Sequence, residues 1–502
     1  MTDSMNLTHQ EAQARWQSII PRPVQAQIRE GVFPFSPATV IRYDPRQPEL
    51  RQAGELLAAW LRTGSGLPLP VEVGTEAGPG VVLLALRPGD MELGEEGYVL
   101  AITPESIVLT ANQPAGILFG LQTLRQLLPP ALESGKRFSG LCAAQAGTIR
   151  DYPRFSWRGF MLDTARHFFP PEEVKRLIDL AALYKLNRFH LHLTDDQGWR
   201  IMINAWPNLA RIGGGSAVNG APGGYYTQAD YTDLAQYARE RGVILVPEID
   251  MPGHTNAALA SYGELNHGGQ PAAIYTGTAV GFSSLAVEEE LTYRFVSDVI
   301  GEIAAITPGP FIHIGGDESD ATDPQGYRRF IERVQEIVHQ QGKRMVGWEE
   351  ISTTTLYADS IAQAWKSPLA LEAARQGAKV IMSPANKVYL DMKATADSRL
   401  GQEWAGIVNV AESYDWDPAG MIPGLDGNVV IGAEAPLWTE TVLNLADAEQ
   451  MIFPRLIGLA DITWSPLAGR DWEEYRTRLA AHNARLKALR VNFYPSAQVN
   501  WR

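Results

Sequence analysis

From about residue 155 onward the chain repeats one pattern, in which a short apolar run is followed by a polar loop and then by a helix-like segment. Clear helices of this kind are PPEEVKRLIDLAALYKL and TDLAQYARERG. Eight runs have the composition of buried parallel strands, namely FMLDTA, RFHLHLT, GVILVPEID, FIHIGGD, RMVGWEE, IAQAW, KVIMSP and VVIGAEAPLW. A doubly wound dinucleotide-binding sheet would need a G-x-G-x-x-G between strand and helix, and none occurs in that context. The pattern therefore predicts an α/β fold, a catalytic (β/α)8 TIM barrel over residues 151–502.

Residues 1–150 differ from the rest. They hold two of the 13 tryptophans, Trp16 and Trp60, and short apolar runs such as VVLLALR and GYVLAIT alternate with helical segments such as PELRQAGELLAAWLRT. This is typical of a small α+β domain, and we expect a mostly antiparallel sheet. Neither an acid pair nor a metal-type cluster stands out in this part of the sequence. We predict a non-catalytic N-terminal domain here.

Composition excludes several classes of partner. The formal net charge of -14 argues against nucleic acid and anionic membranes, since both attract basic patches. The single cysteine, Cys142, rules out an internal disulfide, and neither a signal peptide nor a stretch of about 20 apolar residues is visible. We expect a soluble, cytoplasmic protein, the alternative being a secreted one whose signal peptide has been removed. Oligomeric state is left open.

Polar and aromatic side chains follow every expected strand, where a barrel carries its active site. They are Asp163 and Arg166; Asp195, Asp196 and Trp199; Glu248, Asp250 and His254; Asp317 and Glu318; Trp348, Glu349 and Glu350; Trp365; Tyr389 and Asp391; and Trp438 and Glu440. Tryptophan faces hold pyranose rings, and charged groups give their hydroxyls directional hydrogen bonds. The arrangement predicts a carbohydrate site.

The adjacent acids Asp317 and Glu318 constrain the chemistry. Most glycosidases place two carboxylates about 5–9.5 Å apart across the scissile bond, which adjacent residues do not easily do. In substrate-assisted catalysis the sugar's own 2-acetamido oxygen attacks the anomeric carbon instead. One carboxylate then protonates the leaving oxygen while its neighbour orients the acetamide. Two close anions also raise the proton affinity of one of them.

Five motifs, in order, resemble those of glycoside hydrolase family twenty, the bacterial β-N-acetylhexosaminidases. They are WRGFMLDTARHFFP, LHLTDDQGWRI, PEIDMPGHTNA, HIGGDES and APLWTE. The resemblance spans nearly the whole chain and implies an exo-acting enzyme that removes terminal β-GlcNAc, with β-GalNAc left open as a second substrate, and that acts with retention through an oxazolinium intermediate. It implies no metal or organic cofactor.

The resemblance also implies roles for individual residues. Glu318 corresponds to the general acid/base and Asp317 to the residue that orients the acetamide N–H, while Tyr389 matches the tyrosine that bonds the acetamide oxygen. The acetamide pocket would be walled by Trp348, Trp365 and Trp438, and the sugar hydroxyls held by Arg166, Asp391 and Glu440. Trp404 lies where a further sugar contact is expected, and Asp195 with His254 resembles a pair that tunes the acid, with Asp250 nearby.

Three other interpretations remain open. His190 and His192 lie on one face of a strand and could bind a metal with His254 or His313, although core histidines are far commoner. A non-catalytic carbohydrate-binding protein would keep the tryptophans but would not need the Asp317–Glu318 pair. A two-carboxylate retaining β-glycosidase would use Glu350 or Glu440 as nucleophile and would not require a 2-acetamido group.

Overall fold

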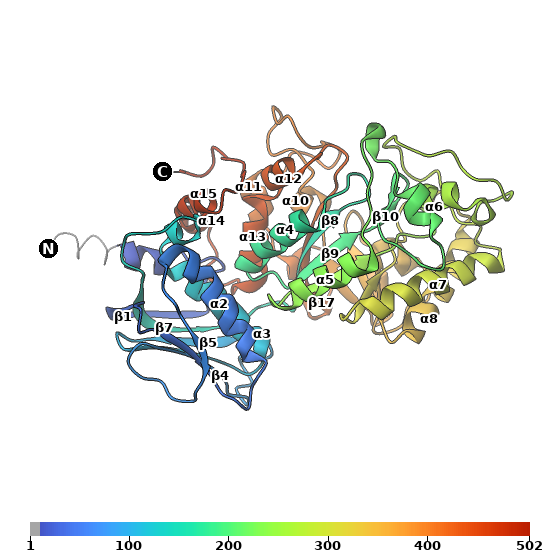
Figure 1. The fold of residues 1–502 in the computed structure, drawn as a ribbon. Coiled ribbons are helices and arrows are strands. Elements are labelled where there is room, and N and C mark those ends of the chain that lie inside the picture. The colour runs from blue at the N-terminus through green and yellow to red at the C-terminus, as the bar shows by residue number, and fades with distance from the viewer. Residues whose placement is uncertain (1–10, 502) are drawn as a thin grey trace.

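The computed structural model describes residues 11–501. Residues 1–10 and 502 lie outside the described residues. The prediction that the N-terminal segment is not a signal peptide falls mostly on these residues. In Figure 1 the N-terminal sheet, in blue, lies beside the larger barrel, and α14 and α15, in red, lie close to that sheet. Among the described residues, no helix is both long and apolar enough to cross a membrane.

The N-terminal sheet has the strand order β1-β7-β5-β6-β4-β2-β3. Its strands are β1 (Gln25–Pro34), β2 (Val40–Tyr43), β3 (Val71–Val73), β4 (Val81–Leu86), β5 (Tyr98–Ile102), β6 (Ser106–Ala111) and β7 (Ala143–Asp151), and its helices are α2 (Leu50–Ser65) and α3 (Pro114–Leu127). The expectation of a mostly antiparallel sheet is wrong. The pairs among β1, β7, β5 and β6 are antiparallel, but those among β6, β4, β2 and β3 are parallel. The parallel pairing of β2 with β3 follows from the helix between them, because α2 carries the chain back to the end of the sheet at which β2 began.

The barrel predicted from the eight apolar runs is present. Eight parallel strands close in the order β12-β13-β14-β15-β16-β17-β8-β9. They are β8 (Trp157–Asp163), β9 (Arg188–His192), β12 (Ile244–Glu248), β13 (Phe311–His313), β14 (Arg344–Trp348), β15 (Ile361–Ala364), β16 (Lys379–Met382) and β17 (Val430–Leu437). Every residue of β8 is buried, as expected for a parallel strand covered by helices on one face and by the barrel interior on the other.

Helices surround the barrel and supply its apolar cover. They are α4 (Pro171–Leu183), α5 (Gln228–Arg239), α6 (Asn256–Ser261), α7 (Glu290–Ile306), α8 (Pro324–Gln340), α9 (Ala370–Arg375), α10 (Ala385–Val388), α11 (Val410–Tyr414), α12 (Leu445–Ile452), α13 (Arg455–Trp464), α14 (Trp472–Ala481) and α15 (Asn483–Ala488). In α8, Asp323 caps the first turn and Pro324 opens the helix. Its buried side recurs every three to four residues, at Tyr327, Phe330, Ile331 and Val334.

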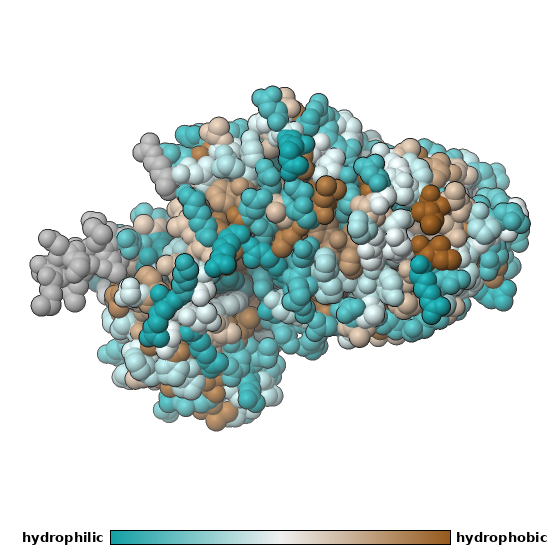
Figure 2. Space-filling model, turned by 45° about the horizontal axis from the view of Figure 1, so that its top comes forward, coloured by the Kyte–Doolittle hydropathy of each residue, from teal (hydrophilic) through white to brown (hydrophobic). Residues whose placement is uncertain are grey.

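A buried polar cluster joins the two parts of the chain. Lys185, which follows α4, places its Nζ 2.8 Å from both the Asp151 carboxylate and the Tyr98 hydroxyl. Trp464 of α13 donates its indole N–H to Asp151 at 2.9 Å, and its side chain packs in the core of the N-terminal sheet. On the face shown in Figure 2, by contrast, hydrophilic residues predominate and hydrophobic ones are scattered.

Candidate active site

A cavity of about 420 Å³ opens at the carboxyl ends of the barrel strands. Ten of the twelve predicted site residues line it: Arg166, His254, Asp317, Glu318, Trp365, Tyr389, Asp391, Trp404, Trp438 and Glu440. The other two, Asp195 and Trp348, are buried outside the lining. Sequence reasoning missed four lining residues, namely Thr278, Val280, Lys366 and Gln402.

The HIGGDES segment turns sharply after β13. Gly315 and Gly316 have φ values of 67° and 93°, which glycine adopts without strain. A Cβ on Gly315 would lie 1.7 Å from Asp250 Oδ1, so no larger residue fits at this position. Glu318 itself has a φ of 45°, an uncommon conformation for a side-chain-bearing residue and one that is often found at functional sites.

One imidazole lies against both acids of this segment. His254 Nε2 is 3.6 Å from Asp317 Oδ2 and 3.5 Å from Glu318 Oε2, and its Nδ1 is 3.1 Å from Asp195 Oδ1. Arg166 in turn holds the other Asp195 oxygen at 2.9 Å. Burial by itself would lower the pKa of His254, but the charges of Asp195, Asp250 and Asp317 raise it well above its ordinary value. These carboxylates therefore favour the protonated, cationic form of the ring.

The two adjacent acids have pKa values shifted in opposite directions. Burial is the main cause that raises the pKa of Asp317 to about 7, against the attraction of His254. Burial also acts to raise the pKa of Glu318, but the nearby imidazole of His254, together with the charge of Lys366, brings it below its ordinary value. The expected rise in proton affinity thus falls on Asp317 in the ligand-free site. Glu318, whose side chain is 27% exposed, faces the open cavity.

Aromatic rings form the cavity's walls. Trp365 and Tyr389 lie parallel, 6° apart in plane, with ring centroids separated by 6.2 Å, and Trp404 meets both edge-on. Trp404 belongs to the loop between α10 and α11, not to a strand end, and is 54% exposed. The ring centroids of Trp348 and Trp438 are 5.8 Å apart, and the Trp348 indole N–H donates to Glu248 Oε1 at 3.0 Å. Trp348 supports the aromatic wall from behind.

Several carboxylate oxygens in the cavity lack a partner among the described residues. They are both oxygens of Asp391, Oε2 of Glu440 and Oδ1 of Asp317. Burial raises the pKa of Asp391 well above its ordinary value, helped by the nearby charge of Glu440. Buried polar atoms are nearly always hydrogen-bonded, so these acceptors point to a ligand rich in hydroxyl or N–H donors.

Most residues of the alternative interpretations are engaged in other contacts. Glu350, one candidate nucleophile, accepts the Trp365 indole N–H at 3.2 Å and lies 3.4 Å from Lys366 Nζ, outside the cavity lining. Glu440 lines the cavity, where burial raises its pKa against the attraction of the Arg166 cation, which suits a group that binds a hydroxyl better than it suits a nucleophile. His190 and His192 lie against the buried Glu248. These positions favour the interpretation in which the catalytic pair is Asp317 and Glu318.

Comparison with known proteins agrees with this geometry. Residues 155–325 and 319–467 match the catalytic domain of glycosyl hydrolase family 20, and residues 17–152 match domain 2 of that family. A β-N-acetylhexosaminidase of Cellulomonas fimi is 40% identical over 489 residues, covering 96% of this chain and 97% of the relative.

Solved structures give the same picture. The Streptomyces plicatus N-acetyl-β-hexosaminidase in complex with Thio-NAglucal superimposes with a TM-score of 0.93 at 47% identity, covering 97% of this chain and 98% of that one. The family 20 β-N-acetylhexosaminidase of Streptomyces coelicolor A3(2) has a TM-score of 0.93 at 45% identity, covering 97% and 99%. A mutant of the Streptomyces plicatus enzyme is in complex with the product GlcNAc.

Proposed function

The chain belongs to glycosyl hydrolase family 20 and is an exo-acting β-N-acetylhexosaminidase, and from this premise we propose how its residues divide the reaction. Glu318 is the general acid/base, and Asp317 accepts the acetamide N–H of the substrate. The observation that carries the proposal is the contact of one cationic imidazole, His254, with both neighbouring carboxylates. These two groups thus lie where one can meet the leaving oxygen and the other the acetamide.

The reaction balances without a protein nucleophile. The acetamide carbonyl oxygen of the bound sugar attacks C1 while the bond to the aglycone breaks, and Glu318 gives its proton to the departing oxygen. Asp317, ionised, stabilises the oxazolinium ring that forms. Water then attacks C1, its proton passes to Glu318, and the ring opens to the β-configured product. The two inversions at C1 give net retention.

Substrate binding prepares Glu318 to act as the acid. In the free site the charges of His254 and Lys366 lower its pKa. A sugar in the cavity covers the exposed side of Glu318 and removes its water, which favours the neutral carboxyl. The acetamide N–H meanwhile holds Asp317 ionised, and that negative charge beside Glu318 acts in the same direction. Binding thus moves the higher proton affinity of the pair from Asp317 to Glu318.

The remaining lining residues hold the sugar. Tyr389 donates a hydrogen bond to the acetamide oxygen, Trp365 and Trp438 enclose the acetamide methyl group with Trp348 packed behind Trp438, and Trp404 covers a sugar face. The hydroxyls go to Arg166, Asp391 and Glu440, and the unpartnered oxygens of the last two support this assignment. His254 and Asp195 keep Glu318 in place, and no cofactor is needed. Acceptance of GalNAc depends on how Arg166 and Glu440 meet an axial 4-hydroxyl.

The organisation of the chain and its place of action are proposals as well. We propose that residues 1–150 form the non-catalytic domain and residues 151–502 the catalytic one. We also propose a cytoplasmic enzyme that does not bind nucleic acid or membranes, on the basis of the net charge of -14 and the buried free Cys142. Fractionation of the source cells with an antibody to the protein tests this, because activity in the medium would show secretion instead.

The deciding experiment compares initial hydrolysis rates of the p-nitrophenyl β-glycosides of GlcNAc, GalNAc and glucose. Strong preference for the acetamido sugars is expected, because only they carry the internal nucleophile. Cleavage of the glucoside at a comparable rate would mean that a protein carboxylate attacks C1. No cleavage of any of the three would favour the non-catalytic sugar-binding protein.

Two variants test the individual roles. Glu318→Gln abolishes hydrolysis of glycosides with poor leaving groups, because no other group protonates the glycosidic oxygen. Asp317→Asn lowers turnover by about a hundredfold or more, as expected when a preorganised charge beside a developing cation is lost. A Glu318→Gln enzyme that retains near-full activity on such substrates would remove Glu318 from the mechanism.

A further inference from the structure

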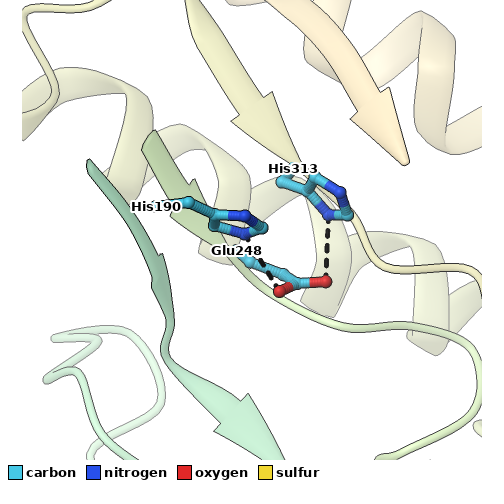
Figure 3. Close-up of side chains that lie close together, drawn as sticks. All are labelled: His190, Glu248 and His313. Atoms are coloured by element: carbon cyan, nitrogen blue, oxygen red, sulfur yellow. Dashed lines mark ion pairs between the residues drawn. The ribbon is translucent and has the colours of Figure 1, made fainter. Parts of the chain in front are cut away.

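A charged cluster lies in the barrel interior, behind the catalytic cavity. Its centre is Glu248, the last residue of β12, and the rings of His190, His192 and His313 lie around it, all of them buried. Figure 3 shows His190 and His313 over the Glu248 carboxylate, each facing a different oxygen. The distances are 3.0 Å from His190 Nε2 to Oε2 and 2.9 Å from His313 Nδ1 to Oε1.

Two further groups complete the surroundings of this carboxylate. His192 Nδ1 lies 2.5 Å from Oε2, and the Trp348 indole N–H donates to Oε1 at 3.0 Å. Burial acts to raise the pKa of Glu248, but the three histidines bring it well below its ordinary value. Glu248 is therefore an anion with a ring nitrogen or indole N–H on each side. A buried charge held in this way cannot shift without losing several charge-assisted contacts at once.

A continuous line of contacts connects Glu248 with the proposed acid. From His192 the line continues through its Nε2, 2.8 Å from Asp195 Oδ2. Asp195 Oδ1 lies 3.1 Å from His254 Nδ1, and His254 Nε2 lies 3.5 Å from Glu318 Oε2. His192 is thus held at both nitrogens and His254 at Nδ1, so the orientation of each ring depends on the group behind it.

We propose that Glu248 is a positioning residue for acid catalysis: through His192, Asp195 and His254 it fixes the orientation from which Glu318 protonates the leaving group. The inference rests on the proposed role of Glu318. Glu248 itself lies outside the cavity lining, so we expect it to make no contact with the substrate. Glu248 also holds the Trp348 indole, but that contact lies on the acetamide side of the site, which is the same for every GlcNAc glycoside.

The same side chains could be considered for a metal site. His190, Glu248 and His313 offer ligand-type atoms within 4.8 Å of one another. Glu248, however, already binds the Trp348 indole N–H at 3.0 Å and His192 Nδ1 at 2.5 Å. His313 Nδ1 accepts the backbone N–H of Gly315 at 3.0 Å. A cation there would have to displace the Trp348 indole or a ring proton in a sealed part of the barrel. The contacts therefore favour an anion that organises its donors.

The chain provides a matched control for Glu248. Glu434, in the middle of β17, is also fully buried and also binds one indole, Trp157 at 2.9 Å, and one imidazole, His190 Nδ1 at 2.8 Å. Its remaining partner is Gln363 at 3.0 Å. None of these contacts reaches Asp195 or His254 directly. Replacing either glutamate by glutamine disturbs the barrel core in a similar way, but only one replacement breaks the line to Glu318.

The test measures kcat/KM for two GlcNAc glycosides, chitobiose and p-nitrophenyl β-GlcNAc. The quantity compared between variants is the chitobiose value divided by the p-nitrophenyl value. A smaller fraction of folded enzyme lowers both values equally and cancels in the ratio. Weaker acid catalysis slows only the cleavage of chitobiose, because its sugar leaving group needs a proton and p-nitrophenolate does not. General acid catalysis contributes about 10²- to 10⁴-fold, so we expect Glu248→Gln to lower the ratio by about tenfold or more. Glu434→Gln should leave it within about twofold of the wild type, because Glu434 contacts His190 but none of His192, Asp195 and His254.

Two further measurements secure the result. His192→Gln alters the next link and must lower the ratio in the same direction, which keeps the test valid if Glu248→Gln does not fold. In an Asp195→Asn background, Glu248→Gln must add little, because groups in one line of contacts are not additive. A ratio unchanged by Glu248→Gln and His192→Gln, or lowered equally by Glu434→Gln, overturns the inference. Glu318→Gln is measured in parallel: if it leaves the ratio unchanged, the assignment of the acid itself is wrong.

Discussion

Two groups of buried charges in this molecule differ in whether the protein supplies their hydrogen-bond partners. At the junction of the N-terminal sheet with the barrel, Asp151 accepts from Lys185, Tyr98 and Trp464 and from one backbone N–H. In the catalytic cavity, both oxygens of the equally buried Asp391 have no partner among the described residues.

The difference separates structure from function without reference to any relative. Burying a charge costs free energy unless it is paired. The junction meets this condition within the protein, so it stabilises the fold as it stands. The cavity does not meet this condition. The raised pKa values of its carboxylates, Asp317 and Asp391, indicate a site in which the ligand supplies the missing partners. The following substitutions test this contrast.

The largest effect on stability is expected at the junction. Lys185→Met leaves the Asp151 carboxylate buried without its cation, which should lower the free energy of unfolding by about 3–5 kcal/mol. The turnover of the folded fraction should not change. Thermal denaturation measures the first quantity, and kcat referred to titrated active sites measures the second.

The matched control is Lys175→Met. Lys175 pairs with the exposed carboxylates of Glu172 and Asp233, and pairs of this kind contribute about 0–1 kcal/mol. If Lys185→Met destabilises no more than Lys175→Met, the junction is not the anchor described above.

At Asp317 the contrast predicts a gain in stability. Its pKa of about 7 lies above the ordinary 3.8, so the folded protein binds the proton more tightly than the unfolded chain does. The resulting penalty is absent well below pH 4, grows as the pH rises, and is complete above about pH 7, with an upper bound of about 4 kcal/mol. Asp317→Asn should therefore raise the melting temperature at pH 8 and by much less at pH 4.

Asp320, which is exposed, supplies the control for this prediction. Asp320→Asn should give a melting temperature that differs from that of the wild type by the same small amount at both pH values. An Asp317→Asn protein that is less stable than the wild type at pH 8 would mean that the contact with His254 outweighs the cost of burial.

Most of this architecture could be predicted from the sequence, and the exceptions have physical causes. The eight barrel strands are continuous apolar runs, and the residues after them, such as Asp317 and Trp365, line the cavity as expected. Thr278, Val280 and Gln402 lie on long loops without periodicity, so nothing local indicates that they return to the barrel mouth. Trp348 ends β14, but the position of a residue at a strand end does not specify whether its side chain reaches the cavity or lies behind its wall.

The same substitution in the two regions should have opposite consequences. Asp391→Asn removes a charged acceptor for a sugar hydroxyl, worth about 1.5–3 kcal/mol, which corresponds to a 10- to 150-fold lower kcat/KM without loss of stability. Asp151→Asn should instead lower the melting temperature and leave kcat/KM of the folded enzyme unchanged. Measuring both quantities for both variants gives four results, and a destabilised Asp391→Asn would contradict the view that its carboxylate awaits a ligand.

The smallest effect is expected at Trp404, the most exposed aromatic residue of the cavity lining. Its ring meets Trp365 and Tyr389 only by its edge, so Trp404→Ala leaves no buried hole and should change stability by less than about 0.5 kcal/mol. Loss of one aromatic contact with a sugar, about 0.5–1.5 kcal/mol, should lower kcat/KM by roughly 2- to 13-fold. Trp404→Phe retains an aromatic ring and should therefore retain most of the wild-type kcat/KM. A Trp404→Ala enzyme with unchanged kcat/KM on chitobiose would show that this ring, although it lines the cavity, does not contact the substrate.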